Sequence, residues 1–380
     1  VMDGISGGIN WNSSDQLAKF LFEELKFKLP KDYRGKDMLT PGGKPKTDAA
    51  AMSALKPTNK RQRHFLAVHK KLSKMNDAMT KYVGKLHAAA HDEGLIHASF
   101  NQTVTATHRL SSSGRKYKIQ YQNIDRNLKP CFTVRNEGWQ FGELDESQLE
   151  YRAAADLAQD EYGLNSIRAG DDPHAFSASI LFDEWEGAVG EAKKAIRTKA
   201  KSDTFKPLFG GSSGTPRQQA YYKAFKERHP RITKWQHDNI AKCLKDKCFQ
   251  QPSGLWYYFP DTKITRSGYV VNTPSICNYP VQGFATADIV PLGMVLVWHL
   301  LAALKMRTFI MNTVHDSILS ESPPDELEAY AQLGSWGFTD GVIELIKKLY
   351  NYEFKCPLEA EIEYGTNWSW YPGWDEQFVI

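Results

Sequence analysis

The stretch of residues 308–320, TFIMNTVHDSILS, constrains the chain most, because it places His315 and Asp316 inside an apolar, β-branched run. Runs rich in Val, Ile, Thr and Phe predict strands. An ionised carboxylate on a half-buried strand needs a cation, a hydrogen-bond network or a raised pKa. The alternative is a turn at the tip of a hairpin, where the carboxylate of Asp316 would simply be solvated.

A second acid, Asp145 in GELDESQLEYR, lies far away in the sequence and has similar surroundings. Two carboxylates that a fold brings together from separate strands form a site for divalent cations, since these hard ions prefer oxygen ligands. The two aspartates therefore predict a metal site on a sheet.

The composition is that of a globular protein. The chain has 380 residues, 41% hydrophobic and 12% aromatic, which allows a large core and two or three subdomains. The five cysteines are odd in number and form no CxxC pair, which argues against a disulfide framework and a zinc site and fits a reducing compartment.

No secretory or membrane-spanning segment is predicted. The N-terminus lacks a basic-then-apolar signal pattern. The longest apolar run, residues 289–304, is interrupted by Pro291, Gly293 and His299 and is too short to span a bilayer, so it predicts a buried helix. Because the chain begins with Val1, we expect it to be part of a longer protein.

The net charge of +4 conceals an uneven distribution along the chain. Residues 56–85 carry nine Lys or Arg against one acid, residues 193–231 carry eleven against two, and residues 321–380 carry twelve acids against three Lys. A single charge run is usually a solvated face. Two basic segments beside a candidate metal site favour a polyanionic partner.

Two stretches near the N-terminus predict helices. NSSDQLAKFLFEEL is typical of a capped helix, and a loop follows it. From about Thr58 to His91, apolar residues recur every three or four positions, which predicts a long amphipathic helix with a basic outer face. Such a helix could lie along a nucleic-acid duplex or be an ordinary surface helix.

Residues 94–124 change from a strand-like segment, IHASFNQTV, to a polar stretch whose side chains suit phosphates and base edges. Within it, TATHRLSSS followed by QNI resembles the T-x-T-G-R-L-S-S and Q-N-I elements of family A DNA polymerases, the DNA polymerase I type. His108 stands where that pattern has glycine. The resemblance implies DNA contacts by Arg109, Gln122 and Asn123.

The segment DESQLEYR, residues 145–152, resembles motif A of the same family, D-Y-S-Q-I-E-L-R. The resemblance implies that Asp145 is a metal ligand, that the backbone carbonyl of Glu146 also faces the metal, and that Glu150 closes the pocket beside the sugar 2′ position. Without the family, LEYRAAADLAQDEY predicts only a helix after a strand, with Glu150 as a solvated acid of its first turn.

The segment RTKAKSDTFKPLFG spaces Arg197, Lys201 and Phe205 four residues apart, so on a helix they share one face. Two cations there could hold a triphosphate. The pattern resembles motif B of the family, R-x3-K-x3-[FY]-x3-Y-G, with Phe209 in place of Tyr. DDPH resembles the family's D-x-H, which implies that His174 contacts phosphates; the basic stretch QQAYYKAFKERHPRITKWQ would complete a helical insertion.

Two further segments resemble motifs of the same family, in the same order along the chain. NYPVQGFATADI resembles N-x-P-x-Q-G and implies minor-groove contacts by Asn278 and Gln282, although Pro274 replaces a usual Arg and one extra residue lies between Gly283 and Asp288. VHDS resembles motif C, V-H-D-E, which implies that Asp316 binds metal and that His315 lies at the DNA; Ser317 replaces the Glu.

The resemblance covers about residues 60–320 and implies an α+β, right-hand fold with a helical thumb, an antiparallel-sheet palm and helical fingers. The expected divisions are 1–100 for the N-terminal segment and thumb, 101–155 for the first part of the palm, 156–250 for the fingers and 251–380 for the second part of the palm. A phage or viral branch of the family is among the sources that fit.

The implied function is template-directed DNA polymerisation, with primer-template DNA and dNTPs as partners and no membrane. Two Mg²⁺ ions, for which Mn²⁺ could substitute, would be held by Asp145 and Asp316, and Lys201 could act as the general acid. The alternatives are a relative that uses an RNA template or ribonucleotides, and a binding protein that has lost catalysis.

We expect a cytoplasmic protein of a bacterial or phage-infected cell, with an organelle left open. An upstream domain or a processivity partner is also left open. Only about 55 residues precede the long basic helix, too few for a proofreading nuclease domain, so none is expected in the chain as given.

Overall fold

The structure is a computed structural model that describes residues 8–32, 35–114 and 116–368. It divides into two compact units, Val1–Asp92 and Glu93–Ile380. The units have separate hydrophobic cores.

The first unit is helical. Its elements are α1 (Ser14–Lys19), η1 (Phe20–Glu24), α2 (Ala49–Ala54), α3 (Lys60–Ala78), η2 (Met79–Val83) and α4 (Gly84–Glu93), the last of which ends one residue past the boundary. The side chains of Ser13, Asp48 and Asn59 accept backbone N–H groups at the starts of α1, α2 and α3. The rings of Phe20 and Phe65, 5.1 Å apart, join η1 to α3. Since α3, η2 and α4 are continuous, the long helix predicted from the sequence is confirmed.

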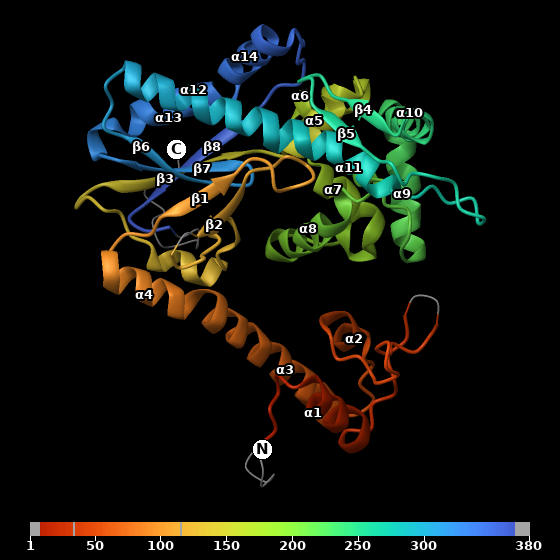
Figure 1. Ribbon diagram of the computed structural model, residues 1–380. Helices are drawn as coiled ribbons and strands as arrows, with labels where there is room; N and C mark the ends of the chain where they lie inside the picture. The colour runs from red at the N-terminus through yellow and green to blue at the C-terminus, as the bar shows by residue number, and fades with distance from the viewer. Residues whose placement is uncertain (1–7, 33–34, 115, 369–380) are drawn as a thin grey trace. The chain divides into compact units, whose positions relative to one another are not determined.

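A four-stranded antiparallel sheet forms the centre of the second unit (Figure 1). Its strands, in spatial order, are β6 (Phe309–Val314), β7 (Ser317–Ser322), β3 (Gln140–Glu146) and β8 (Ala360–Gly365). A two-residue turn, His315-Asp316, joins β6 to β7, and His315 adopts the positive φ of 59° that such turns require. A continuous strand through Asp316 is therefore wrong, and the hairpin turn of the alternative is confirmed. The simply solvated carboxylate of that alternative is wrong, because Asp316 is partly buried in the turn.

The two faces of this sheet differ. Leu144 of β3 lies opposite Ile318 of β7 and Ile362 of β8, so the three side chains share one face and enter the core. The helices α12 (Val290–Ala303), α13 (Leu327–Phe338) and α14 (Asp340–Tyr350) contribute to this core. The other face carries Asp145, as the alternation of a strand requires.

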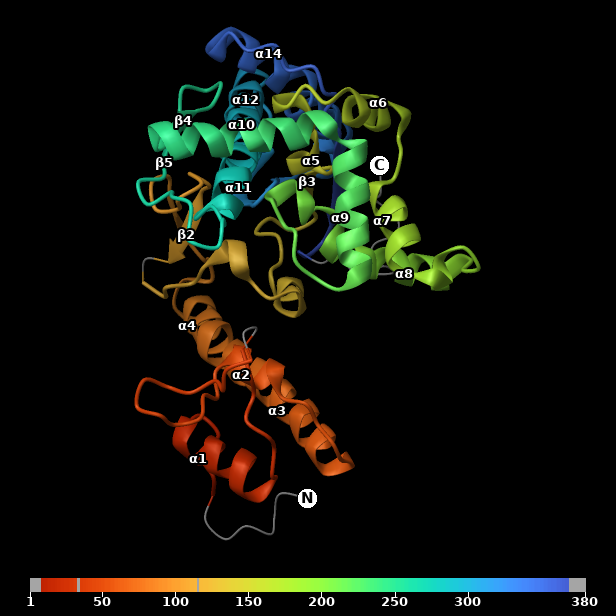
Figure 2. The same ribbon diagram turned by 90° about the vertical axis from the view of Figure 1, so that its right-hand side faces the viewer.

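Helices between β3 and the last strands form a second core. They are α5 (Leu149–Leu157), α7 (Pro173–Leu181), α8 (Gly190–Thr204), α9 (Pro216–Arg228), α10 (Pro230–Asp246) and α11 (Thr273–Gly283). The helix α6 (Glu161–Ala169) instead contributes Leu164 to the core beneath the sheet. Figure 2 shows α7 and α8 packed beside α9. Leu208, Tyr221 and Ile232 are buried at the centre of this core.

The remaining elements are short. The strands form two hairpins, β1 (Ala98–Asn101) with β2 (Ser111–Gly114), and β4 (Cys248–Gln250) with β5 (Trp256–Tyr258). The short helices are η3 (Tyr121–Asn123), η4 (Arg126–Cys131), η5 (Asp183–Trp185), η6 (Pro207–Phe209), η7 (Phe284–Ile289) and η8 (Pro324–Glu326). All five cysteines are free thiols, as expected.

One helical stretch, Thr273–Ala303, has 31 residues and is long and apolar enough to cross a membrane; no second one occurs in the described ranges. It consists of α11, the π-helical turn η7 and α12. Val290, Val297 and Leu301 are buried in the core of the second unit, whereas Val295 and Trp298 are exposed, so the buried helix predicted for residues 289–304 is confirmed for one face. The prediction that this apolar run is too short to span a bilayer is wrong for the helix as a whole, because α11 and η7 extend it to 31 residues. A core helix of this kind is weak evidence for a membrane span.

The predicted α+β class is confirmed by the mixture of helices with an antiparallel sheet. The predicted subdomain boundaries stay a prediction.

Candidate active site

Asp145 and Asp316, 171 residues apart in the sequence, lie at the same end of the central sheet. Asp145 pairs with Ser317, the residue after Asp316, in the ladder between β3 and β7. The N–H of Glu146 donates to the carbonyl of Asp316 over 3.3 Å. The ladder therefore brings the two predicted metal ligands together.

Burial and mutual repulsion make these carboxylates hard to ionise. Burial, followed by the charges of Asp316, Glu143 and Glu363, raises the pKa of Asp145 to about 7. Burial also raises the pKa of Asp316, although His315 and Arg109 oppose the shift. Acids whose charges repel each other in this way fit a divalent cation, which would relieve the repulsion.

Glu146 adds a further unusual acid. Its side chain is 2% exposed, and neither carboxylate oxygen has a hydrogen-bond partner among the described residues. Burial raises the pKa of this carboxyl well above its usual range. No group of three or more His, Cys, Asp or Glu side chains in the described ranges is arranged to hold a metal. Mg²⁺ sites commonly use one or two carboxylates, with water and substrate oxygens completing the shell, so the pair of aspartates still fits.

A hollow of about 310 Å³ opens beside Asp145 and is lined by residues that the sequence analysis did not single out. They are Lys129, Glu143, Ser147, Glu361 and Glu363. Glu363 pairs with Glu143, and Glu361 pairs with Asp145, so these acids share the face of the sheet opposite the core. The alternation of acids at every second position in GELDE and AEIEYG is the sequence feature from which this acidic face could have been predicted.

Glu150, in the first turn of α5, contacts the next predicted residues. Its carboxylate accepts a hydrogen bond from Gln282 of α11 over 3.3 Å. Burial raises its pKa, while Gln282 and the positive charge of Arg109 lower it. The positive charge of Arg109 also lowers the pKa of His315 and opposes the rise in the pKa of Asp316.

The other predicted DNA contacts lie on η3 and α11. Gln122 and Asn123 belong to η3, which lies against β6, and Gln122 is buried. Asn278 lies one helical turn before Gln282 on α11, and its side-chain oxygen is buried without a hydrogen-bond partner among the described residues.

Arg197 and Lys201 lie on α8, one turn apart. Two nitrogens of Arg197 donate to the carboxylate of Asp172 over 2.5 and 3.1 Å. Asp172 also caps α7 by accepting the N–H of His174. The sequence analysis missed this function of Asp172, which fixes the orientation of Arg197 and leaves its remaining N–H groups for a ligand. Lys201 is exposed.

His174 is buried, and its Nδ1 lies 3.0 Å from the hydroxyl of Thr204. Burial, followed by the positive charge of Arg197, lowers its pKa to about 4. At neutral pH the ligand-free His174 is therefore uncharged, so it offers a hydrogen bond and no positive charge.

Phe205 is the C-cap of α8 and lies just past its last helical residue. The helix therefore carries Arg197 and Lys201, but it ends one residue before Phe205, the third residue predicted to share its face. Its ring stacks on Tyr151 of α5 at 5.6 Å and meets the ring of His174 edge-on at 5.3 Å. Phe209 ends η6, and Gly210 follows with φ of 75°, a conformation that disfavours a side chain. These contacts fix the Phe205 ring between α5 and α7.

Three departures from the family patterns have visible structural consequences. His108 replaces glycine and adopts a φ of 62°, which explains why the pattern prefers glycine there. Pro274 lies in the first turn of α11, where no backbone N–H is needed. The extra residue between Gly283 and Asp288 falls within the π-helical turn η7, and such turns accommodate one added residue.

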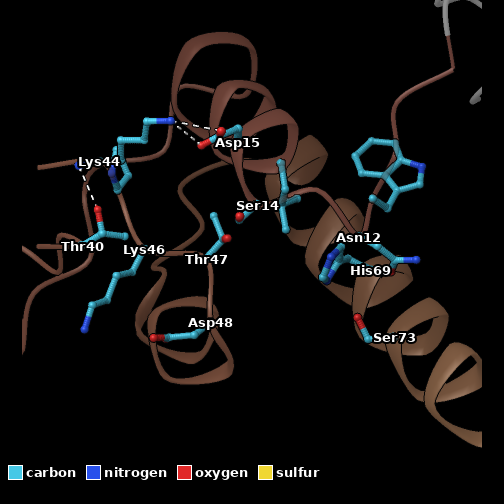
Figure 3. A pocket seen from close by; sticks show the side chains of 13 residues that line it. Asn12, Ser14, Asp15, Thr40, Lys44, Lys46, Thr47, Asp48, His69 and Ser73 are labelled. Atoms are coloured by element: carbon cyan, nitrogen blue, oxygen red, sulfur yellow. Dashed lines mark hydrogen bonds and ion pairs between the residues drawn. The ribbon is translucent and has the colours of Figure 1, made fainter. Parts of the chain in front are cut away.

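A different hollow belongs to the first unit (Figure 3). It encloses about 480 Å³ and is lined by Trp11, Asp15, Lys44, His69 and Ser73, among others. Lys44 donates to both carboxylate oxygens of Asp15 over 3.0 Å, so the principal charges there neutralise each other. None of the predicted site residues lines this hollow.

The raised pKa of Asp145 predicts how stability depends on pH. Its pKa of about 7 exceeds the ordinary value of 3.8, so between these pH values the folded chain holds a proton that the unfolded chain has lost. Asp145 therefore lowers the free energy of unfolding as pH rises from about 4 to about 7. In EDTA at pH 8, Asp145→Asn should melt a few degrees higher than the wild type, since about 1 kcal/mol corresponds to about 2–4 °C in a domain of this size.

Thermal melts at pH 5, 6, 7 and 8 test this expectation. The difference between variant and wild type should shrink towards pH 5. Asp238→Asn, which removes an exposed acid paired with Lys234 on α10, should show no such trend. A difference that does not change with pH would contradict the assignment.

Paired carboxylates at one end of an antiparallel sheet, with a cationic helix in the same unit, fit the requirements of a phosphoryl-transfer site. Comparison with known proteins identifies the family. The model of DNA polymerase family A matches residues 2–370, and the chain belongs to that family. Members of this family generally depend on a divalent metal.

Similar proteins agree with this assignment. The chain is 31% identical over 377 residues to a thermostable DNA polymerase I of Thermus thermophilus, covering 94% of this chain and 41% of that protein. It is 28% identical over 381 residues to DNA polymerase I of Mycobacterium tuberculosis, covering 95% and 38% respectively. The chain thus spans about two fifths of the length of these relatives.

A solved structure extends the similarity to the fold. It is the POL domain of Pol1 from M. smegmatis in complex with DNA primer-template and dNTP. The TM-score is 0.74 at 26% sequence identity, covering 95% of this chain and 61% of that chain. The predicted polymerase fold is thereby confirmed.

Proposed function

We propose that this chain is a template-directed DNA polymerase that adds deoxynucleotides to the 3′-hydroxyl of a primer. The observation that carries the proposal is the meeting of Asp145 and Asp316 on the sheet, in a chain that belongs to DNA polymerase family A. Its partners would be primer-template DNA and dNTPs, by analogy with the similar M. smegmatis complex.

Asp145 and Asp316 would hold two Mg²⁺ ions, or Mn²⁺ in their place, with the backbone carbonyl of Glu146 as a further ligand. When bound, the metal would supply charge neutralisation at the attacking and leaving oxygens. The two aspartates would position the primer 3′-hydroxyl for in-line attack. Their raised pKa values support this role, since a site with competing negative charges favours a bound cation.

Side chains of α7 and α8 would bind the incoming nucleotide. Arg197 and Lys201 would neutralise the triphosphate, and Lys201 could protonate the leaving group. His174 would contribute a hydrogen bond. Phe205 and Phe209 would pack against the nucleotide, and Glu150 would close the space beside the sugar 2′ position. The fixed pairing of Arg197 with Asp172 supports this arrangement.

DNA would be bound by polar and basic side chains on several elements. These are Arg109, Gln122, Asn123, Asn278, Gln282 and His315. Two observations support such contacts: the side-chain oxygen of Asn278 has no hydrogen-bond partner among the described residues, and the positive charge of Arg109 acts on the pKa of Asp316. We also propose a cytoplasmic location, which agrees with the bacterial relatives.

Primer extension tests the proposal directly. The chain should extend a labelled primer on a DNA template with dNTPs and Mg²⁺, and EDTA should abolish extension. Parallel reactions on an RNA template and with ribonucleotides test the RNA-using alternative. Duplex binding without extension under any of these conditions would favour the binding-protein alternative.

Glu150 gives a prediction about sugar selection. Glu150→Ala should admit ribonucleotides, because it opens the space that a 2′-hydroxyl would occupy. Glu150→Gln keeps the size of the side chain and should retain most of the discrimination. Competition between rNTP and dNTP at one template position measures the effect, and an unchanged ratio in Glu150→Ala would remove Glu150 from this role.

A further inference from the structure

Ser317 stands where the V-H-D-E pattern has a glutamate, so the hairpin tip lacks the acid that would follow Asp316. Ser317 is 2% exposed and pairs directly with Asp145 in the ladder between β3 and β7. Opposed residues of an antiparallel ladder share a face, so the side chain at position 317 lies on the same face as Asp145. A glutamate at position 317 would therefore lie on the face of the sheet that carries the candidate metal site.

A carboxylate from the neighbouring strand contacts this serine. The hydroxyl of Ser317 donates to Oε1 of Glu143 over 2.7 Å, with the carbonyl of Val314 as a longer alternative acceptor at 3.1 Å. Glu143 lies two residues before Asp145 on β3, so it shares the face of Asp145 and is the diagonal neighbour of Ser317. Its negative charge helps to raise the pKa of Asp145.

The Glu143 carboxylate is held in place from its other side. Its Oε2 accepts the indole N–H of Trp368 over 2.9 Å, and the ammonium of Lys129 lies 3.8 Å away. Glu143 is 8% exposed and Trp368 is 2% exposed. A carboxylate whose two oxygens are both engaged, in buried surroundings, has little rotational freedom.

The position of this carboxylate matches that of the missing one. The Oγ of a serine stands where the Cγ of a glutamate would stand, and bond lengths place the oxygens of a glutamate about 2.4 Å beyond its Cγ. Oε1 of Glu143 lies 2.7 Å from Oγ of Ser317. Glu143 therefore puts a carboxylate oxygen at about the distance that a glutamate at position 317 would reach.

We propose that Glu143 is a positioning residue that replaces the absent glutamate of motif C from the adjacent strand. Through Ser317 it holds the turn that carries Asp316 in place beside Asp145, and it returns a negative charge to the site. The effect on catalysis rests on the proposed function. The structural part of the proposal, that one acid is exchanged between two positions in contact, is independent of that function.

A double-mutant cycle tests the exchange with four proteins: the wild type, Glu143→Ala, Ser317→Glu and the double variant Glu143→Ala/Ser317→Glu. Ser320→Ala is the matched control, because the hydroxyl of Ser320 also joins β7 to β3, over 3.0 Å to the carbonyl of Gly142, but from the opposite face of the sheet. For each protein we would measure Mn²⁺ binding without nucleic acid, the melting temperature in EDTA, and primer extension as a function of Mg²⁺ concentration.

Each single variant should weaken Mn²⁺ binding and raise the Mg²⁺ concentration for half-maximal extension by about tenfold or more, the range typical for residues that orient metal ligands. Glu143→Ala leaves the site one acid short, and Ser317→Glu places two carboxylates against each other. The double variant should return to within about threefold of the wild type. In EDTA, Ser317→Glu should lower the melting temperature, and adding Glu143→Ala should restore it. Ser320→Ala should leave metal dependence unchanged.

A double variant no better than the worse single variant in Mn²⁺ binding and melting would overturn the proposal. These two measurements need no polymerase activity. A wild type that fails to extend primers would therefore refute the proposed function while the cycle still decides the position of Glu143.

Discussion

Asp145→Asn and Asp316→Asn should each reduce primer extension by about three orders of magnitude or more. Both substitutions keep the size of the side chain and remove a charge from the end of the sheet, where the ladder brings the two carboxylates together. The loss of metal-mediated charge stabilisation, roughly 4 kcal/mol, corresponds to about a thousandfold in rate. Single-turnover extension with saturating dNTP and Mg²⁺ measures the effect.

Primer-template affinity should change little in the same variants, because basic and polar side chains elsewhere would bind the duplex. Fluorescence anisotropy with a labelled duplex measures this affinity. Asp238→Asn, on the exposed surface of α10, is the control for loss of an acid and should extend primers at the wild-type rate. A rate within tenfold of wild type in either site variant would disprove the two-metal assignment.

Phe205→Tyr should largely remove discrimination against 2′,3′-dideoxynucleotides. A dideoxynucleotide lacks the 3′-hydroxyl that a normal substrate can bond to its own phosphate, and a phenyl ring offers no replacement. The family resemblance associates the Phe or Tyr choice at this position with rejecting or accepting such terminators. One charge-assisted hydrogen bond, about 1.5–3 kcal/mol, corresponds to roughly one to two orders of magnitude in selectivity.

The contacts of Phe205 in the structure bear on this substitution. The ring of Phe205 stacks on Tyr151 and meets His174 edge-on, and we expect these two contacts to hold the ring in the same orientation in Phe205→Tyr. Competition between ddNTP and dNTP at one template position gives the ratio for each protein. Phe100→Tyr adds the same hydroxyl to a ring on β1 that is 37% exposed and has no proposed role at the nucleotide, and it should change the ratio less than twofold. Equal ratios for the wild type and Phe205→Tyr would refute the motif B assignment.

Much of this site could be predicted from the sequence because its key residues lie in short, ordered motifs. Asp145 and Asp316 were identified as a pair from acids in strand-like surroundings, and the antiparallel ladder does bring them together. The long basic helix followed from apolar spacing, since a helical face repeats within a few residues. Patterns of this local kind depend on near neighbours in the chain.

The parts that were missed depend on the register between distant segments. The contact of Glu143 with Ser317 joins residues 174 positions apart, and that of Glu143 with Trp368 joins residues 225 apart. A shift of one residue in the pairing of β3 would turn Glu143 to the other face. The pairing of Asp172 with Arg197 similarly requires the packing of α7 on α8. None of these follows from local periodicity.

The π-helical turn at Phe284–Ile289 separates the two ends of one long helix in a way that matters for how such a chain can change over evolution. In a regular helix, one added residue would rotate every later side chain by about 100°. Here Gln282, before the turn, keeps its contact with Glu150, while Asp288, at its end, bonds to the hydroxyl of Tyr350 over 3.1 Å. The turn allows the side chains of α11 and those of α12 to face directions that a single regular helix would not combine. The end of the helix near Glu150 and the end in the core can therefore accept substitutions independently, as two elements would, although no loop separates them.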